Sequence, residues 1–191
     1  MKNPTELHKV TERARNRGAQ GDVDLALDQF VAEPDTPPPA MTSPDQVKQA
    51  DAEVMASLGV HIKGENRSGT YILHDFHPLS LVAQSDDFEL LAIAEALKKH
   101  DWLGERYYWR VVPADRDKYT EICASVSEPQ GFFIHVKKGA KVAFPVQACL
   151  YISQNKIAQR VHNIIIVEEG SELHLIMGGA TGPGVEIGVH L

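Results

Sequence analysis

The sequence is short of cysteine and of basic residues, and each shortage excludes a class of protein. Its 191 residues include only two cysteines, Cys123 and Cys149, which lie far apart in the sequence. Two isolated cysteines form neither a disulfide framework nor a CxxC metal-binding pair, so we expect both to be free thiols. The 26 acidic residues outnumber the 19 basic ones, for a net charge of −7. This balance argues against a nucleic-acid partner, which would require a basic stripe.

Long apolar runs and targeting signals are also missing. No apolar run approaches the ~20 residues that a helix needs to cross a bilayer. The N-terminal stretch MKNPTELHKVTERARNRG carries charge throughout and contains no apolar core of a secretory signal. The sequence therefore predicts no membrane span and a cytoplasmic location.

Several sequence motifs of enzymes are absent as well. There is no GxxxxGK[ST] phosphate-binding loop, no G-x-S-x-G nucleophile elbow and no HExxH zinc motif. The glycine-rich stretch GGATGPG at 178–184 lacks the strand and helix of a dinucleotide site, and turn chemistry explains it better. With 43% hydrophobic residues, the chain can still form a core and fits one or two domains.

The last third of the chain, from Gln130 to Leu191, predicts densely packed β-structure. Short β-branched and aromatic runs alternate there with Gly, Pro, Asn or pairs of charges. Six runs have the length of strands: Phe132 to Val136, Val142 to Val146, Ala148 to Ile152, Asn163 to Val167, Leu173 to Met177 and Val185 to Leu191. Spacing alone leaves a sandwich or barrel of hairpins and a solenoid of stacked coils both open.

Two turns in this region have the same construction. KKG at 137–139 and EEG at 168–170 each place two like charges before a glycine, between two apolar runs. After the second turn, Leu173, Leu175 and Met177 alternate with polar or outward-facing residues. We therefore expect these three side chains to face inward.

Upstream of this region the sequence favours helices joined by a linker. Pro4 to Arg17 and Asp22 to Phe30 have helical composition, and PDTPPPAMTSP at 34–44 is typical of an extended linker. Ser43, Pro44 and Gln46 form a capping box that predicts a helix as far as Leu58, ended by Gly59.

A second helix is expected to begin at Ser85-Asp86-Asp87, with an apolar face of Leu90, Ile93, Ala94 and Leu97. Its C-terminal end is followed by an aromatic cluster, formed by Trp102, Tyr107, Tyr108 and Trp109. We expect this cluster to pack the helical part against the first β-strands.

Histidines of the β-region are the candidate metal ligands. Stacked strands would bring His162, His174 and His190 toward one column, where Cys149 and Glu172 are further candidate ligands. Of these, we expect His162, His174 and Cys149 to be the best candidates for metal ligands. The alternatives are hydrogen-bonded surface histidines and an inert buried thiol. In YILHDFHPL, His74, Asp75 and His77 are close enough for a small polar site, but a turn stabilised by Asp75 and ended by Pro78 explains them better.

The motifs together resemble the SufB/SufD family of iron–sulfur cluster assembly proteins. The resemblance is carried by QGFFIHVKKGAKVAFPVQACLYIS, then RVHNIIIVEEGSELHLIMGG, and upstream by RSGTYILHD and EALKKHDWLGERYYWRVVPADRDKYT. It covers roughly Ala50 to Leu191. It implies a mainly β protein with a helical N-terminal region, whose core is a right-handed parallel β-helix. The implied division is a helical and linker segment (1–40), an α+β region (41–119) and an incomplete β-helix (120–191).

The resemblance also implies a function without catalysis. A member of this family is a scaffold that pairs with a like subunit along the β-helix, holds an iron–sulfur cluster transiently, and works with a SufC-like ATPase. The ATPase-binding region and the later cluster ligands would lie beyond Leu191, so no firmly bound cofactor is expected here. Gly179 stands where SufB members often carry a cysteine. Because the sequence stops inside a strand-like run without a cap, we expect a fragment or natural truncation that keeps the platform only.

Two other classes of function stay open at this point. One is a cupin-like metalloenzyme that uses His162, His174 and His190 as ligands, although these residues are more widely spaced than cupin ligands. The other is an interaction module whose last β-layer recruits a partner by strand addition.

Overall fold

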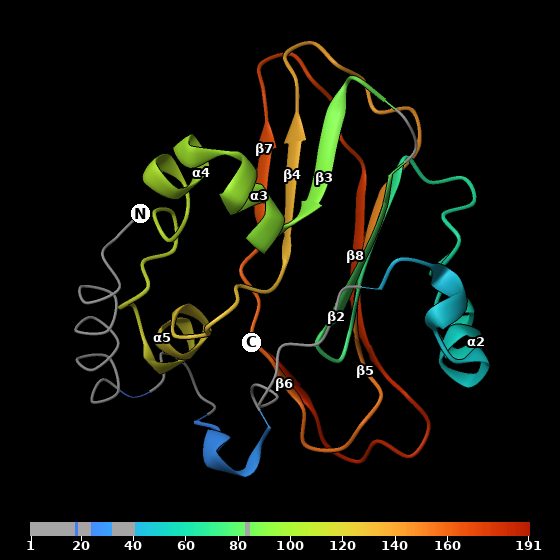
Figure 1. The fold of residues 1–191 in the computed structure, drawn as a ribbon, viewed down its shortest axis with the longest axis vertical. Coiled ribbons are helices and arrows are strands. Elements are labelled where there is room, and N and C mark those ends of the chain that lie inside the picture. Colours follow the sequence, from blue (N-terminus) through green and yellow to red (C-terminus); the bar gives the residue numbers. More distant parts are fainter. Residues whose placement is uncertain (1–17, 19–23, 32–40, 83–84) are drawn as a thin grey trace.

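The computed structural model describes residues 18, 24–31, 41–82 and 85–191, which form three β-sheets flanked by short helices (Figure 1). In order, the elements are η1 (Leu27–Gln29), η2 (Pro44–Gln46), α2 (Gln49–Ser57), β1 (Gly69–His74), β2 (His77–Val82), β3 (Phe88–Ala92), α3 (Ile93–Lys99), α4 (Asp101–Arg106), α5 (Lys118–Ala124), β4 (Phe132–Val136), β5 (Val146–Ile152), β6 (Ala158–Gln159), β7 (Ile164–Val167), β8 (Leu175–Thr181) and β9 (Val189–His190). The predicted helix from Pro4 to Arg17 and most of the proline-rich linker lie outside the described residues. Of the helix predicted from Asp22 to Phe30, the described part contains only the short 3₁₀ turn η1.

The capping box at Ser43 is confirmed, but the helix that follows is divided. The Ser43 side chain accepts from the backbone of this first turn, and Gln46 Oε1 accepts from Ser43 N at 3.0 Å. This turn is the 3₁₀ helix η2, and two extended residues separate it from α2. Gly59 follows the end of α2 with a φ of 80°, the left-handed conformation expected of a C-terminal glycine.

The helix predicted from Ser85 begins too early. Phe88–Ala92 forms strand β3, which pairs antiparallel with β4, and helix α3 starts only at Ile93. Helical spacing of Leu90 and Ile93 was a local signal, whereas the ladder with β4 and the burial of Phe88 and Leu90 are tertiary effects that override it.

The sheets are mixed, and the strands after residue 130 pair with one another only in parallel. Strand order is β2-β1-β5-β8 in one sheet, β3-β4-β7 in a second and β6-β9 in a third. The antiparallel pairs are β1 with β2 and β3 with β4. The predicted mainly β fold is therefore confirmed. Because β1 joins β5 and β3 joins β4, residues before 120 share sheets with those after it; the predicted domain division stays a prediction.

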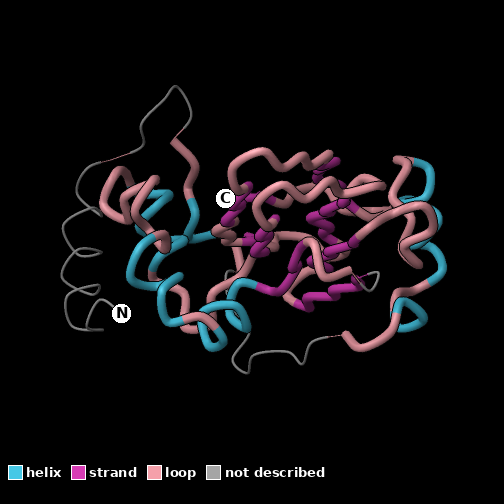
Figure 2. Tube along the Cα trace, turned by 90° about the horizontal axis from the view of Figure 1, so that it is seen from above, coloured by secondary structure: helices cyan, strands magenta, loops and turns pink. Residues whose placement is uncertain are grey.

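The parallel pairs divide the end of the chain into two repeats. Phe133 pairs with Ile164, Val146 with Leu175 and Ala158 with Val189. Partners are thus about 30 residues apart, a period typical of stacked coils. We call residues 131–161 the first repeat and residues 162–191 the second repeat. Seen from above, their strands lie in the middle of the molecule with helices at both ends (Figure 2).

The spacing shortens at one corner, where one predicted strand is wrong. Lys141 and Glu172 form a parallel β-bridge, and Val146 and Leu175 are the next paired residues. Four residues separate Lys141 from Val146, whereas only two separate Glu172 from Leu175. Val142 to Val146 was predicted as a strand, but only Val146 belongs to one, the start of β5. Pro145 lacks the N–H that a continuous ladder needs, which explains the break.

The main core lies between the two larger sheets. Tyr71, Leu73, Val146, Ala148 and Leu150 of one sheet face Phe88, Leu90, Phe132, Ile134 and Val136 of the other. The rings of Tyr71 and Phe132 meet across the gap with centroids 5.4 Å apart. This core therefore joins strands from both halves of the chain.

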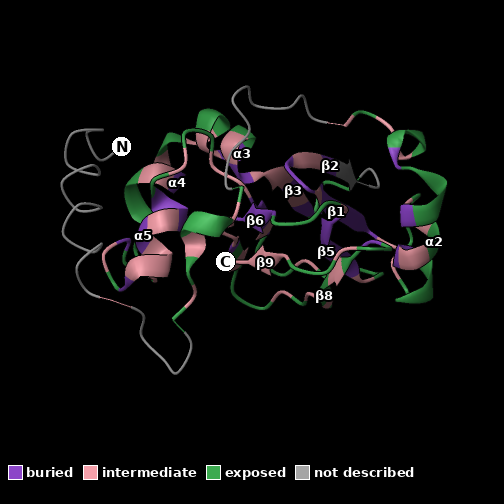
Figure 3. Cartoon of the chain, turned by 90° about the horizontal axis from the view of Figure 1, so that it is seen from below, coloured by how far each residue is buried: buried purple, intermediate pink, exposed green. Residues whose placement is uncertain are grey.

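The core thins toward the second repeat. Every residue of β5 is buried, whereas β8 is intermediate or exposed (Figure 3). Of the three side chains expected to face inward, Leu173 and Leu175 pack against the core. Met177 is 57% exposed, because no layer covers it within the described residues.

Helices cover the outer faces of the sheets. On one side, α3 and α4 pack Ile93, Ala96 and Leu103 against Phe133 and Ile164. Trp102 and Tyr108 join this cluster, so these two of the four predicted aromatic residues dock the helical part on the strands. Trp109 instead packs in a separate cluster with Cys123 and Ala124, and Tyr107 is exposed. On the other side, α2 packs against β1 and β5 (Figure 1).

Two composition-based expectations can be checked directly. Cys123 and Cys149 are both free and buried. Among the residues that the structure describes, no helix combines the length and the apolar character needed to cross a bilayer.

Candidate functional site

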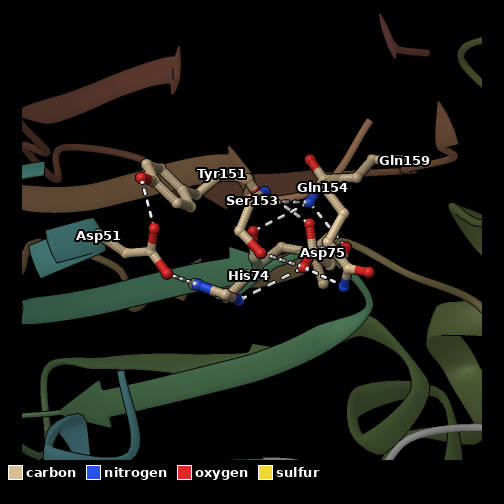
Figure 4. Close-up of polar contacts among 8 residues, drawn as sticks. Asp51, His74, Asp75, Tyr151, Ser153, Gln154 and Gln159 are labelled. Atoms are coloured by element: carbon tan, nitrogen blue, oxygen red, sulfur yellow. Dashed lines mark hydrogen bonds and ion pairs between the residues drawn. The ribbon is translucent and has the colours of Figure 1, made fainter. Parts of the chain in front are cut away.

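A buried polar network joins α2 to the ends of β1 and β5 (Figure 4). Asp51 extends from α2, and its Oδ1 accepts from the Tyr151 hydroxyl at 3.0 Å. Its Oδ2 lies 3.0 Å from His74 Nε2, and the His74 ring stacks on Tyr151 with centroids 5.3 Å apart. Burial and the neighbouring Asp51 carboxylate raise the pKa of Tyr151, so the phenol stays protonated and acts as a donor. We call Asp51, His74 and Tyr151 the α2 anchor.

Asp75 extends this network into the turn between β1 and β2. Its φ of 51° is left-handed, a conformation that aspartate tolerates better than most residues. Its carboxylate accepts from Ser153 N at 2.7 Å and from Ser153 Oγ at 2.6 Å, and also from the Gln154 side chain at 3.2 Å. The predicted turn at Asp75 is thus confirmed, although Pro78 lies within β2 rather than ending the turn.

Gln159 completes the network from the strand β6. Its fully buried amide places Nε2 2.7 Å from the carbonyl oxygen of Asp75 and 3.0 Å from those of Leu73 and Tyr151. His190 Nδ1 lies 2.7 Å from Gln159 Oε1 and donates to it, because that oxygen can only accept. One glutamine therefore ties β1, β5 and the second repeat together.

The hydrogen bonds of this network show which role each of its side chains plays. Ser153 Oγ donates to Asp75 and makes no contact with His74, so the serine, histidine and aspartates do not form a nucleophile relay. A relay requires the imidazole to accept the proton of the hydroxyl. Asp51 instead joins α2 to His74 of β1 and Tyr151 of β5, and Asp75 joins the turn after β1 to Ser153 after β5.

The predicted metal candidates lie in three different surroundings. Cys149 is buried beneath α2 in a cluster with Met55 and Ile72, and burial raises the pKa of its thiol to about 11. His162 packs on Trp109 with ring centroids 4.0 Å apart, and burial lowers its pKa to about 4. His174 is exposed beside β8. Within the described ranges, no group of three or more His, Cys, Asp or Glu is placed to hold a metal ion. Ligation by these residues stays a prediction.

Gly179 has a clear steric role. It pairs with Leu150 in the ladder, and a Cβ at this position would lie 2.9 Å from the His190 ring. Any side chain here, a cysteine included, would require the imidazole to move from Gln159.

Sequence reasoning missed Asp51 and Gln159. A signal for Asp51 existed, because it precedes Met55 by one helical turn and so shares the face that α2 buries. Gln159 gave no local signal, since its carbonyl partners Leu73 and Asp75 lie far away in sequence.

Comparison with known proteins defines the class of this chain. An iron–sulfur cluster assembly SufBD family protein of Methanothermobacter thermautotrophicus strain Delta H is 36% identical over 186 residues, which cover 96% of this chain and 45% of the relative. A SufBD family protein of Archaeoglobus fulgidus is 38% identical over 141 residues, 74% of this chain and 37% of the relative. No family model matches the chain.

A more distant relative agrees over a shorter region. A SufBD family protein of Staphylococcus aureus is 34% identical over 83 residues, 44% of this chain and 18% of the relative. The chain belongs to the SufBD family. It spans less than half the length of the curated relatives that it matches.

Proposed function

We propose that this chain provides the platform of a scaffold subunit of SufB/SufD type in iron–sulfur cluster assembly. The observation that carries the proposal is the parallel register of the two repeats within a SufBD family member. Regular spacing of paired strands on successive faces is what the opening coils of a right-handed parallel β-helix would give. The α2 anchor and the packing of α3 would hold the first coils of that β-helix against the α-helices that cover them.

In this proposal the chain is not itself an enzyme. Its buried network is satisfied internally, and the thiol of Cys149 has a raised pKa beneath α2, so neither offers a reactive group to solvent. Iron and sulfur would be cargo, received where this subunit meets a like subunit in the cytoplasm. A SufC-like ATPase would act on the assembly through a longer member of the family.

Co-purification tests this proposal. The tagged chain would be co-expressed with a like subunit and a SufC-like ATPase of the same organism, with an unrelated tagged domain as control. We expect the chain to retain the like subunit, and the ATPase only when the like subunit is present. Retention of neither protein by the folded chain would contradict the scaffold role.

A further inference from the structure

Helix α2 is joined to the rest of the fold at few points. Of its nine residues, only Asp51 and Met55 are buried. Neither end continues directly into another regular element, because extended Val47 and Lys48 precede the helix. Gly59 follows it with a φ of 80°. Non-helical residues at both ends can change their backbone angles while the helix between them keeps its shape, so α2 is able to move as a unit.

The chain on each side of α2 is fastened to the sheet independently of the helix. Before α2, Met41 N donates to the Pro78 carbonyl of β2 at 2.9 Å. After α2, His61 N lies 3.2 Å from Oε1 of the buried Gln147 in β5, and Gln147 Nε2 donates to the His61 carbonyl at 2.6 Å. The helix is the part of the chain between these two fixed points. Movement of α2 therefore need not detach the chain on either side.

The helix covers one face of the sheet that contains β1 and β5. Side chains of a strand alternate between the two faces of its sheet. Ile72 and Cys149 lie beneath α2, whereas their neighbours Tyr71 and Ala148 point the other way, into the main core. Backbone hydrogen bonds hold β1 to β5 without help from α2. Opening of α2 would thus uncover Cys149 and leave both the ladder and the main core intact.

The α2 anchor is the polar contact that holds this cover in place (Figure 4). Asp51 is the residue of α2 in it, and each of its carboxylate oxygens makes one contact, to Tyr151 and to His74. Met55 is the one residue of α2 that is both apolar and buried. Two hydrogen bonds and one large apolar side chain are a small attachment compared with a continuous ladder of strands. We therefore expect α2 to open before the sheet does.

We propose that α2 is a hinged lid over Cys149, and that the α2 anchor keeps the lid closed. With the lid closed, the thiol is shielded, as in the structure. With the lid open, a small reagent in solution reaches the thiol while the sheet stays folded. The helix thereby sets how fast this thiol can react. This device does not depend on the proposed role in cluster assembly.

Thiol labelling tests the lid, and Cys123 provides an internal control. Cys123 is buried in a different cluster, with Trp109 and Ala114. Burial raises the pKa of both thiols to about 11, so neither reacts readily while it is covered. The folded chain would be treated with iodoacetamide in increasing urea, and mass spectrometry would follow each cysteine separately.

The urea dependence of the two rates separates a lid from global unfolding. Cys149 should react without urea, and its rate should rise only weakly as urea is added, because opening of a short helix exposes little surface. Circular dichroism measures global unfolding in the same solutions. Labelling of Cys149 with the same steep urea dependence as global unfolding would overturn the proposal.

Paired tyrosine variants test whether the α2 anchor is the latch. Tyr151→Phe removes the hydroxyl that donates to Asp51 and keeps the ring. It should raise the rate of Cys149 labelling about two- to tenfold, the equivalent of one hydrogen bond. Tyr71→Phe is the matched control, at a fully buried tyrosine on the other face of the same sheet, and should leave that rate nearly unchanged. Equal effects of the two variants on Cys149, or equal acceleration of Cys123 by Tyr151→Phe, would refute the assignment.

A second variant keeps the test valid if Tyr151→Phe does not fold. Asp51→Asn replaces a charged acceptor with a neutral one of the same shape. Because hydrogen bonds to a charged acceptor are the stronger ones, this change should also speed Cys149 labelling. No change in the rate would contradict the role of Asp51 as the latch.

Hydrogen exchange decides which element opens. Cys149 also pairs with Gly178 of β8 in the parallel ladder, so loss of β8 is the other route to the thiol. If α2 is the lid, Tyr151→Phe should speed exchange of the α2 amides by the same factor as the labelling and leave those of β8 unchanged. Faster exchange across β8 would assign the exposure to the second repeat and overturn the proposal. None of these measurements involves a second protein, so their outcome is independent of the co-purification test.

Discussion

Ile134 and Ile165 occupy matching positions one layer apart, but their surroundings differ. Ile134 is in the first repeat and fully buried, with β3 on one side of its strand and β7 on the other. Ile165 is in the second repeat and 44% exposed, because β7 has a neighbour on one side only within the described residues. Burial in this fold thus depends on having a layer on each side as well as on residue type.

The same comparison holds for charge. The first repeat is basic and covered, and the second repeat is acidic and open on one side within the described chain. Like-charged turns stacked in register would repel one another, so alternation of sign favours this order of layers. The difference suggests that charge sets which segment can lie next to which, while apolar contacts supply most of the stability.

The largest expected effect compares the two isoleucines directly. Ile134→Ala should lower the free energy of unfolding by about 2–5 kcal/mol, because it leaves a cavity in a closed core. Ile165→Ala should cost less than about 1.5 kcal/mol, because solvent already reaches that side chain. Urea unfolding followed by circular dichroism measures both. Equal losses would show that the second repeat is as well covered as the first.

A second substitution tests the bond by which Gln159 of the first repeat holds His190 of the second. Gln159→Leu removes the amide shared by three carbonyl groups and His190, and should cost about 2–3 kcal/mol. The matched control is Gln154→Leu, at an exposed residue with a single bond to Asp75, and should cost less than about 1 kcal/mol. Hydrogen exchange should then show faster opening at β9 in Gln159→Leu alone; similar exchange in both variants would argue against the tie.

Lowering the pH should weaken the packing of His162, in the second repeat, on Tyr108 and Trp109 in the turn after α4. Burial lowers the pKa of the folded imidazole to about 4, whereas the unfolded one titrates near 6.5. Between these values the unfolded chain binds the extra proton, so stability is full above pH ~6.5 and falls toward pH ~4. Because this side chain is only half-buried, we expect a loss of about 1 kcal/mol.

The contribution of His162 can be isolated with His162→Phe. Thermal melts between pH 4 and 7 should show a shallower dependence on pH in the variant than in the natural chain. The matched control is His174→Phe, which makes the same substitution at an exposed histidine of the same repeat and so accounts for any general effect of the change. Identical pH profiles for all three proteins would contradict the buried-imidazole explanation.

The smallest effect is expected from the ion pairs between the repeats, such as that of Lys138 with Glu169. Lys138→Glu places like charges at neighbouring turns and should lower the melting temperature slightly at low salt. Adding Glu169→Lys should restore it, because the pair is re-formed with its charges exchanged. Both differences should disappear near 1 M salt, and their persistence would mean that the contact is not electrostatic.

Sequence patterns predicted strands best where a short apolar run is bounded by turns. Phe132–Val136 was predicted with both ends correct, and the strand predicted from Asn163 starts one residue later at Ile164. The Ser85 helix was wrong because β3 pairs with β4, a strand much further along the chain. The parallel arrangement came from the family resemblance and not from the spacing, which fits hairpins equally well.

The candidate site was less predictable than the strands. The turn at Asp75 followed from a local pattern, but its binding to Ser153 did not, because the two residues are 78 positions apart. The acidic and basic turns were both noticed in the sequence. Their opposition required the register, since each sits between similar apolar runs and the parallel pairing of β4 with β7 brings them together.

The spacing between paired strands shortens at the corner before β5 and is restored at the corner before β9. The first repeat has two more residues than the second at the corner before Val146, and the second has two more than the first at the corner before Val189. Between these corners, β5 and β8 pair residue by residue. Corners can thus change length independently of the strands that they connect. Exposed Pro183 and Gly184 are accordingly a suitable place for a genetically inserted tag or fluorescent label, which would leave both sheets intact.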